Sequence, residues 1–323
     1  MKRLEAVFLV LGALVLAALL RHYGLSETLD ALRPLGPWLP LLFALEGVGK
    51  AFNAWALQAV MPPTRKADLG FGAVFDATLQ ADAVNCLLPT ASLGGNALLI
   101  RRLGKSAGTS EATAAVTTAN TAQTIAQFLF VLAGTALAAG SFAPSRELSL
   151  GLTATAAVSV IVIGLSFAVQ LGGPFGVAHA VMKRLGLRLP YLLERETKIA
   201  ALDARLRGFL SDRPWNFAAC VLLFGLGWVW SAVELAVALS LMGVEADLRR
   251  ILAIEALAAF VDAIVFFVPA KAGAQEGGKV LAFALAGLPA AAGLAFGLLR
   301  RARELAWALL GYLLLWCHRR NNS

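Results

Sequence analysis

Five long apolar runs, each of sufficient length to cross a lipid bilayer, constrain the fold of this chain most strongly. They lie at about 38–60, 110–140, 149–171, 214–243 and 289–317. A membrane-spanning helix needs about 20 predominantly apolar residues. The whole chain carries only 15% charged residues, well below the roughly 25% of soluble domains. The sequence therefore predicts an all-α polytopic membrane protein.

A sixth apolar run, from Val7 to Leu20, follows the basic start Met-Lys-Arg. A signal peptide and a retained first helix share this pattern, but no small-x-small cleavage site precedes Arg21. We interpret the run as a retained span, which brings the expected total to about six spanning helices.

Two further segments, at about 68–104 and 247–287, are apolar but interrupted by a Pro/Gly/Ala break. The break begins at Pro89 in the first segment and at Pro269 in the second. The helix expected after the first break has about 11 residues, or roughly 16 Å, which is too short to span. Irregular backbone at membrane depth must be buried in protein or face water. We therefore expect two re-entrant helical hairpins, each of which enters and leaves on the same side.

The distribution of basic residues favours one orientation in the membrane. With a cytoplasmic N-terminus and non-crossing hairpins, 17 basic residues fall inside and five outside. The inside group comprises Lys2, Arg3, Arg65, Lys66, Arg101, Arg102, Lys105, eight basic residues between Lys183 and Arg213, Arg319 and Arg320. The outside group comprises Arg21, Arg33, Arg146, Arg249 and Arg250. This satisfies the positive-inside rule and predicts a multi-pass protein of the bacterial cytoplasmic (inner) membrane with both termini in the cytoplasm. Basic loops also account for the net charge of +8, so no nucleic acid is expected as a partner.

The two interrupted segments resemble each other at an offset of 180 residues. The matched pairs are Asp82 with Asp262, Pro89 with Pro269, and Asn96 with Glu276. Three crossings separate the starts of the two units, so we expect inverted repeats, which are typical of transporters. Chance similarity among apolar segments is the alternative. The single membrane domain 1–323 is divided into a first span and external loop (1–36), repeat one (37–140), a linking span and cytoplasmic loop (141–213), and repeat two (214–317).

The hairpin sequences carry two motifs. The first runs Ala83-Val84-Asn85-Cys86-Leu87-Leu88-Pro89 and continues with Gly94-Gly95-Asn96. The second runs Val268-Pro269, then Gly273-Ala274-Gln275-Glu276-Gly277-Gly278, and later Arg300-Arg301-Ala302-Arg303-Glu304-Leu305. These motifs resemble those of the flippase-like membrane family, which includes the transmembrane region of lysylphosphatidylglycerol synthases. The resemblance is closest to the hopanoid-biosynthesis-associated branch, and it implies a membrane protein that handles lipid.

The chain departs from the family pattern at both breaks. The first motif of the family usually ends in a glutamate where this chain has Asn96. A glycine usually follows the second proline, where this chain has Ala270 and then Lys271. No segment of this sequence matches the soluble aminoacyl-transferring domain of the synthases, so synthesis of aminoacylated lipid is not expected.

A charged cluster lies near the middle of the last expected span. Arg300, Arg303 and Glu304 share one helix face because positions i, i+3 and i+4 are neighbours. Burying such charges costs roughly 2.5–3.5 kcal/mol each on insertion scales. In one interpretation, the two arginines bind an anionic lipid head group, since guanidinium forks fit phosphate oxygens. In the other, Glu304 neutralises Arg300 and the remaining charges pair with Glu276 or Asp262.

Each break is expected to position residues for binding or gating. Glu276 starts a short helix, whose dipole favours a carboxylate there; a gating or proton-coupled role is the alternative. Thr90 and Ser92 are expected to cap the short helix of the first hairpin, whose N-terminus attracts anions. For the two matched aspartates we favour packing or hydrogen bonding over direct substrate contact. The candidate substrate-binding residues are Arg300, Arg303, Glu304, Glu276, Asn96, Ser92 and Thr90. The candidate hairpin or gating residues are Pro89, Gly94, Gly95, Asp82, Pro269, Gly273 and Asp262.

Polar side chains also share faces within the expected spans. Glu46 can pair with Lys50 at i, i+4, and Asn53 lies on the same face. Glu234 has no such local cation, so its partner is expected elsewhere. A further stripe consists of Asn120, Gln123 and Gln127. We expect these stripes to face the interior of the bundle, either joining helices or lining a cavity.

Motifs for catalysis are missing from the sequence. It carries no HExxH, no nucleophile elbow and no nucleotide-binding loop, and its three scattered cysteines form no metal-binding pair. We predict no enzyme activity, no cofactor and no metal. The leading hypothesis is an inner-membrane lipid flippase or lipid transporter that moves an anionic or polar lipid between leaflets. The alternatives are a small-solute secondary transporter and a non-transporting membrane partner of lipid-synthesis enzymes.

Overall fold

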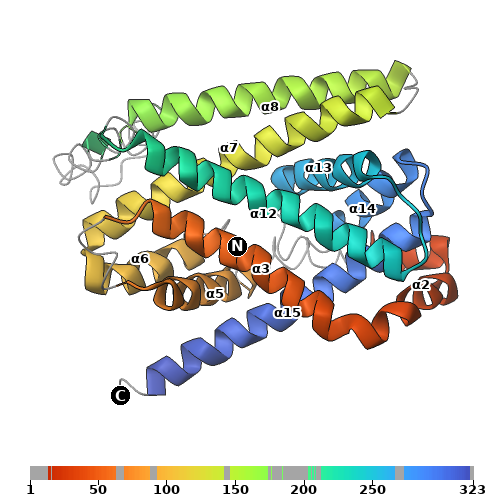
Figure 1. Cartoon of the computed structure of the whole chain (residues 1–323), viewed down its shortest axis with the longest axis horizontal. Helices are drawn as coiled ribbons and strands as arrows, with labels where there is room; N and C mark the ends of the chain where they lie inside the picture. The colour runs from red at the N-terminus through yellow and green to blue at the C-terminus, as the bar shows by residue number, and fades with distance from the viewer. Residues whose placement is uncertain are drawn as a thin grey trace.

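The computed structural model describes residues 14–15, 17–62, 69–87, 93–141, 146–173, 212–265 and 273–320, together with isolated positions between 176 and 208. Every regular element in these ranges is helical, and the longest helices run along the longest axis of the molecule (Figure 1). In chain order the elements are α2 (Leu25–Leu32), the 3₁₀ helix η1 (Arg33–Trp38), α3 (Leu39–Ala59), α5 (Phe71–Leu87), α6 (Leu93–Ala107), α7 (Thr109–Ser141), α8 (Arg146–Gly172), α12 (Pro214–Leu241), α13 (Leu248–Ile264), α14 (Ala274–Leu285) and α15 (Ala290–Arg320).

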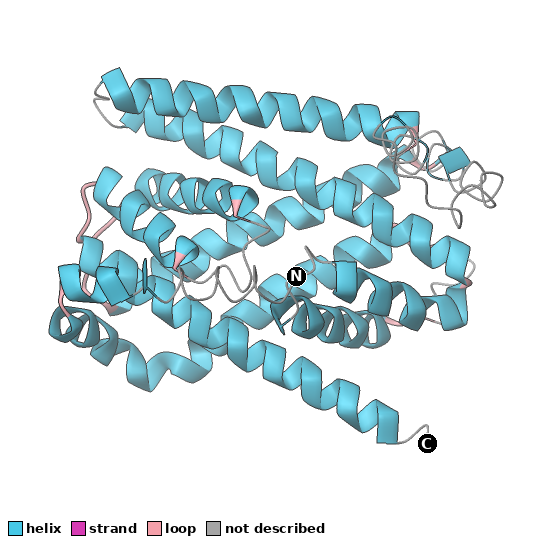
Figure 2. Cartoon of the chain, turned by 180° about the vertical axis from the view of Figure 1, so that it is seen from behind, coloured by secondary structure: helices cyan, strands magenta, loops and turns pink. Residues whose placement is uncertain are grey.

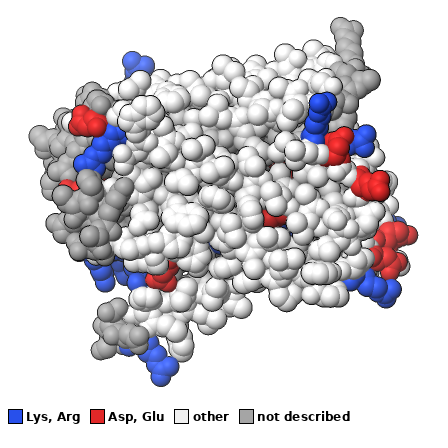
Figure 3. All heavy atoms as spheres, viewed as in Figure 1, with Lys and Arg blue, Asp and Glu red and all other residues white. Residues whose placement is uncertain are grey.

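The outer surface of the bundle is apolar over most of its length. Charged side chains gather at the two ends of the view in Figure 3, and the area between them is almost free of charge. Within the described ranges, three helices are long and apolar enough to span a bilayer: α7, α8 and α12. Helix α8 packs against α7 and exposes Ile161, Leu165 and Leu171. A water-facing helix would not leave so much apolar surface uncovered, so the chain is a multi-pass membrane protein.

Two helical hairpins occupy opposite ends of the bundle. Helix α5 packs against α6, and α13 packs against α14. The first pair lies at the left of Figure 1 and the second at the right, and the positions are exchanged in the reverse view of Figure 2. Both interrupted segments of the sequence therefore form helix pairs, as predicted, but α6 has 15 residues and not the 11 expected. The helix continues through its basic last turns, where Arg101 and Lys105 are exposed.

A glycine ends α6 and sets the sharp turn into α7. Gly108 has a φ of +90°, a conformation that side chains with a Cβ rarely adopt. Its N–H donates to the carbonyl of Gly104, and its own carbonyl accepts from Ala112. One residue thus closes the first helix and opens the second, which fixes α6 beside α7.

Each hairpin packs against the last long helix of the other half. Helix α5 contacts α15, and α13 contacts α7. A buried glycine allows a close approach at both crossings: a Cβ on Gly311 would meet the backbone of Leu79, and one on Gly134 would meet Ala256. The offset from 134 to 311 and from 79 to 256 is 177 residues in both cases. This offset differs by three residues, close to one helical turn, from the 180 of the hairpin motifs, so the two crossings are built in the same way on the same helix faces.

We expect Gly311→Ala and Gly134→Ala to destabilise the fold, because the added methyl group meets backbone or a neighbouring Cβ that cannot move aside. Overpacking of this kind costs roughly 1–3 kcal/mol. The measurement is the apparent melting temperature of the purified protein in detergent. Gly164→Ala in α8 is the matched control, since nothing lies within 4 Å of its added Cβ and alanine favours a helix. Equal melting temperatures for Gly311→Ala and the control would contradict the close crossing.

Candidate functional site

Three arginines near the middle of α15 are each engaged by carboxylates. The most enclosed is Arg303, whose side chain is 4% exposed. Its Nη2 donates to Oε2 of Glu234 at 3.0 Å, its Nη1 donates to the carbonyl of Leu42 at 2.9 Å, and its Nε lies 3.6 Å from Oε2 of Glu46. Glu234 therefore has the distant cationic partner that its sequence context predicts. Two nitrogens of the guanidinium thus donate to acceptors on α3 and α12, while Nε lies near Glu46 without forming a hydrogen bond.

Arg300 belongs to a group of buried side chains that joins four helices. Its Nη1 lies 3.0 Å from Oε2 of Glu255 in α13, while Nζ of Lys279 in α14 lies 3.4 Å from the other oxygen of that carboxylate. Glu255 also accepts a hydrogen bond from Ser231 in α12 at 3.2 Å. A longer contact of 3.7 Å joins Nε of Arg300 to Glu304, as the spacing i, i+4 predicts.

Arg301 links α15 to the second hairpin. Its Nε lies 3.2 Å from Oε1 of Glu276, and its Nη1 lies 3.4 Å from Oε2 of Glu304. Glu276 lies in the first turn of α14, where a carboxylate was expected on account of the helix dipole. Each arginine of the motif at 300–305 thus has at least one carboxylate partner, while Nη2 of Arg301 and Nε of Arg303 are buried without a hydrogen bond among the described residues. This geometry favours the structural interpretation of Arg303 over contact with an anionic head group.

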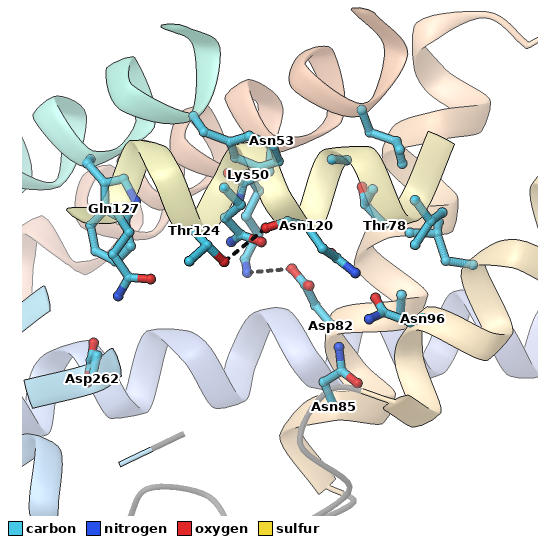
Figure 4. Close-up of a pocket in the computed structure, with 18 of the residues that line it drawn as sticks. Lys50, Asn53, Thr78, Asp82, Asn85, Asn96, Asn120, Thr124, Gln127 and Asp262 are labelled. Carbon is cyan, nitrogen blue, oxygen red and sulfur yellow. Dashed lines mark hydrogen bonds and ion pairs between the residues drawn. The ribbon is translucent and has the colours of Figure 1, made fainter. Parts of the chain in front are cut away.

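A cavity of about 640 Å³ lies beside this network, within the usual range for ligand pockets of about 300–1,000 Å³. It is lined by residues from α3, α5, α6, α7, α12 and α13. Figure 4 shows polar side chains from these helices converging on it. The labelled lining residues are Lys50, Asn53, Thr78, Asp82, Asn85, Asn96, Asn120, Thr124, Gln127 and Asp262.

One ion pair joins two of the helices that line the cavity. Nζ of Lys50 in α3 lies 3.4 Å from Oδ2 of Asp82 in α5 and 3.8 Å from Oε1 of Glu46. The predicted pair between Lys50 and Glu46 is therefore present, and Lys50 has a second partner on the first hairpin. This side chain ties α5 to α3 at the edge of the cavity (Figure 4).

The structure brings together part of the predicted site. Asn96, Asp82 and Asp262 all line the cavity, as does the expected stripe on α7, whereas Arg300, Arg303, Glu304 and Glu276 are not among its lining residues. Gly94 and Gly95 lie in the first turn of α6, where Gly95 N–H donates to Oδ1 of Asn85 at 2.8 Å. Gly273 precedes α14 with a φ of +75°. Four predicted positions lie outside the described residues: Pro89, Thr90, Ser92 and Pro269.

Two buried charges were not singled out from the sequence. Glu255 is 1% exposed and Lys279 is 4% exposed, and they form a pair between α13 and α14. Each is an isolated ionisable residue within an apolar stretch, which is the signal that could have found them. Among the described residues, no cluster of His, Cys, Asp and Glu side chains is arranged to hold a metal ion.

A family comparison matches almost the whole chain. The profile described as "Lysylphosphatidylglycerol synthase TM region" covers residues 6–311. The chain belongs to this family. No curated protein and no solved structure significantly matches it. The resemblance inferred from the two hairpin motifs is thus confirmed for this family, and the association with hopanoid biosynthesis stays a prediction.

We expect Arg303→Ala to destabilise the protein strongly, because it leaves Glu234 buried without its cation and Glu46 with Lys50 alone. Breaking one partner of a buried pair costs about 3–5 kcal/mol. The apparent melting temperature in detergent measures the loss. Replacing both partners, as Arg303→Met with Glu234→Gln, should recover part of it. Arg33→Ala is the control, since its pair with Asp30 is exposed and contributes about 0–1 kcal/mol. A melting temperature for Arg303→Ala equal to that of the control would contradict a structural role for Arg303.

Proposed function

We propose that this chain is a lipid flippase or lipid transporter of the bacterial inner membrane, with both termini in the cytoplasm. The observation that carries the proposal is the polar cavity, lined by helices of both proposed units, in a bundle that exposes many large apolar side chains. A lipid head group that crosses the membrane needs such a polar path, while its chains stay in the surrounding hydrocarbon. The family is described by the membrane region of a lipid synthase, which is consistent with lipid handling.

The hairpins support a re-entrant arrangement. Helices α5 and α13 have 17 residues, α6 has 15 and α14 has 12, or about 18–26 Å at 1.5 Å per residue. Each pair starts and finishes at its own end of the bundle (Figure 1). These lengths fall short of a hydrocarbon core of about 30 Å, so we propose that neither hairpin crosses the membrane.

The packing supports inverted repeats. Helices α3 and α12 are the first long helices of the proposed units, and they run in opposite directions in Figure 1. They pack against each other, and each also contacts the hairpin of its own half. The reciprocal contacts of α5 with α15 and of α13 with α7 are those expected from a two-fold axis in the membrane plane.

The proposed topology makes a direct prediction for labelling. Cysteines that replace Arg102 and Arg213 should react only with reagents added from the cytoplasmic side, and cysteines at Arg146 and Gly243 only with reagents added outside. Membrane-impermeant maleimides on intact and opened cells measure this. Labelling of the Arg102 position from outside alone would show that the first hairpin crosses the membrane.

Translocation itself can be measured in proteoliposomes with fluorescent lipids whose outer-leaflet copies are bleached chemically. Wild-type protein should raise the bleached fraction above the half that protein-free vesicles allow. Gln123→Trp, which places a large ring in the cavity, should slow translocation at least tenfold. Leu165→Trp on the exposed face of α8 is the matched control and should leave the rate unchanged. A cavity variant as active as the control would rule out this path.

The same assay separates the alternatives. A small-solute transporter would move solute and no lipid, and it would respond to Gln123→Trp. A non-transporting partner of lipid-synthesis enzymes would move neither, with or without the substitution.

A further inference from the structure

The polar groups of the cavity are mainly uncharged. Six of its lining residues carry side-chain amides: Asn53, Asn85, Asn96, Asn120, Gln123 and Gln127. Thr78 and Thr124 add hydroxyl groups. An amide offers two donors and an acceptor on the same short side chain. A hydroxyl-rich ligand presents the same alternation of donors and acceptors, so the two surfaces are complementary.

Most of this hydrogen-bonding capacity is available to a ligand. Asn85 accepts from Gly95 N–H, and Gln127 donates to the carbonyl of Ala259 at 2.9 Å. Within the described part of the chain, the side-chain amides of Asn53, Asn96, Asn120 and Gln123 make no hydrogen bond. Asn120 and Gln123 are exposed and belong to one stripe of α7, which faces Asn96 and Asp82 across the cavity (Figure 4).

The charges of the cavity wall disfavour an anionic ligand. Lys50 is the single cation among the described lining residues, and it is already paired with Asp82 and Glu46. Asp262 is a further carboxylate of the lining, and no hydrogen bond or ion pair engages it in the described residues. The arginines that would suit phosphate are bonded to glutamates outside the lining. A phosphate would therefore meet a carboxylate and no unpaired guanidinium.

Asp262 is a strong acceptor for hydroxyl groups, because a carboxylate accepts through both of its oxygens. Phe128, Phe224 and Trp228 also line the cavity, and the ring of Trp228 is stacked on Phe130. Flat aromatic faces cover the apolar C–H face of a sugar ring, while amides bind its hydroxyl groups. An ammonium group would also be attracted to Asp262 and to the aromatic rings, but it has no acceptor for the N–H donors of the amides, which a hydroxyl-rich ligand satisfies.

We propose that the cavity binds an uncharged, polyhydroxylated head group, a sugar or polyol carried by a lipid. This inference names the substrate class of the proposed lipid transporter and rests on that proposal. The lipid is favoured over a free sugar because α7 and α12, two of the helices that line the cavity, are long and apolar enough to span a bilayer.

Binding to the detergent-solubilised protein can be titrated with four probes. These are monoglucosyldiacylglycerol, phosphatidic acid, a diacyl trimethylammonium lipid and methyl glucoside. We expect the glucosyl lipid to bind at least tenfold more tightly than each of the others. Tighter binding of phosphatidic acid or of the trimethylammonium lipid would overturn the head-group class. If methyl glucoside binds as tightly as the glucosyl lipid, the proposal that the head group is carried by a lipid is wrong.

Substitutions assign the binding to the cavity. Asn120→Ala and Gln123→Ala should each weaken the glucosyl lipid about three- to tenfold, as expected for one uncharged hydrogen bond. Asn216→Ala removes an amide that donates to the carbonyl of Ala59 outside the cavity, and it should leave the affinity unchanged. Melting temperatures of the variants confirm folding. Unchanged affinity in both cavity variants would place the ligand elsewhere and overturn the proposal.

Asp262→Asn separates a hydroxyl ligand from a cationic one. The amide still accepts from a hydroxyl group, so the affinity for the glucosyl lipid should fall at most about threefold, whereas an ammonium ligand would lose nearly all binding.

The vesicle assay distinguishes failure of this inference from failure of the proposed function. Binding of the glucosyl lipid without translocation would overturn only the function, and translocation of phosphatidic acid without glucosyl binding would overturn only the head-group class.

Discussion

The buried ion pairs of α15 determine how the other helices are placed. Three arginines in one apolar bundle must meet carboxylates, because an isolated charge in hydrocarbon is costly. Those carboxylates come from α3, α12, α13 and α14, so four helices converge on the middle of α15. Each glutamate is unfavourable in its own apolar helix and becomes acceptable only when the bundle is assembled. The network therefore stabilises this arrangement of helices relative to other arrangements that bury the same apolar area.

The two halves share a packing scheme and differ in chemistry. In the second half, Glu255, Lys279 and Glu276 join the arginine network. In the first half, the helices of the hairpin contribute amides to the cavity, and Asn96 stands where the repeat places Glu276. The matched glycine crossings at Gly134 and Gly311 keep the scaffold alike. The same packing scheme thus holds buried ion pairs in the second half and places uncharged amides along the cavity in the first half.

The sequence was sufficient to predict interactions within one helix, but it did not predict which residues meet between different helices. The pair between Glu46 and Lys50 follows from positions i and i+4 on one helix, and the stripe on α7 follows from helical periodicity. The partner of Glu234 lies 69 residues away, and no spacing rule connects two different helices. The convergence of Asn85 and Asp262 on one cavity likewise depends on how the hairpins pack. The length of α6 was underestimated because the helix begins at Leu93, within the expected break, and continues past residue 104 to Ala107, whose side chain is buried in the core.

The charges of α15 are held in ion pairs, whereas several amides of the cavity make no hydrogen bond, and this difference is consistent with transport. A carrier must hold a head group well enough to admit it and weakly enough to release it. Uncharged hydrogen bonds contribute about 0.5–1.5 kcal/mol each and exchange with water, whereas charge-assisted bonds are stronger. The second hairpin is joined to α15 by two ion pairs with buried glutamates, Arg300 with Glu255 and Arg301 with Glu276. The described ionic contacts of the first hairpin with other helices involve more exposed side chains, since Lys50 pairs with half-exposed Asp82 and His318 lies 3.7 Å from Asp76. If head groups cross here, the ionic contacts of the hairpin of α5 and α6 are therefore the ones whose loss costs least.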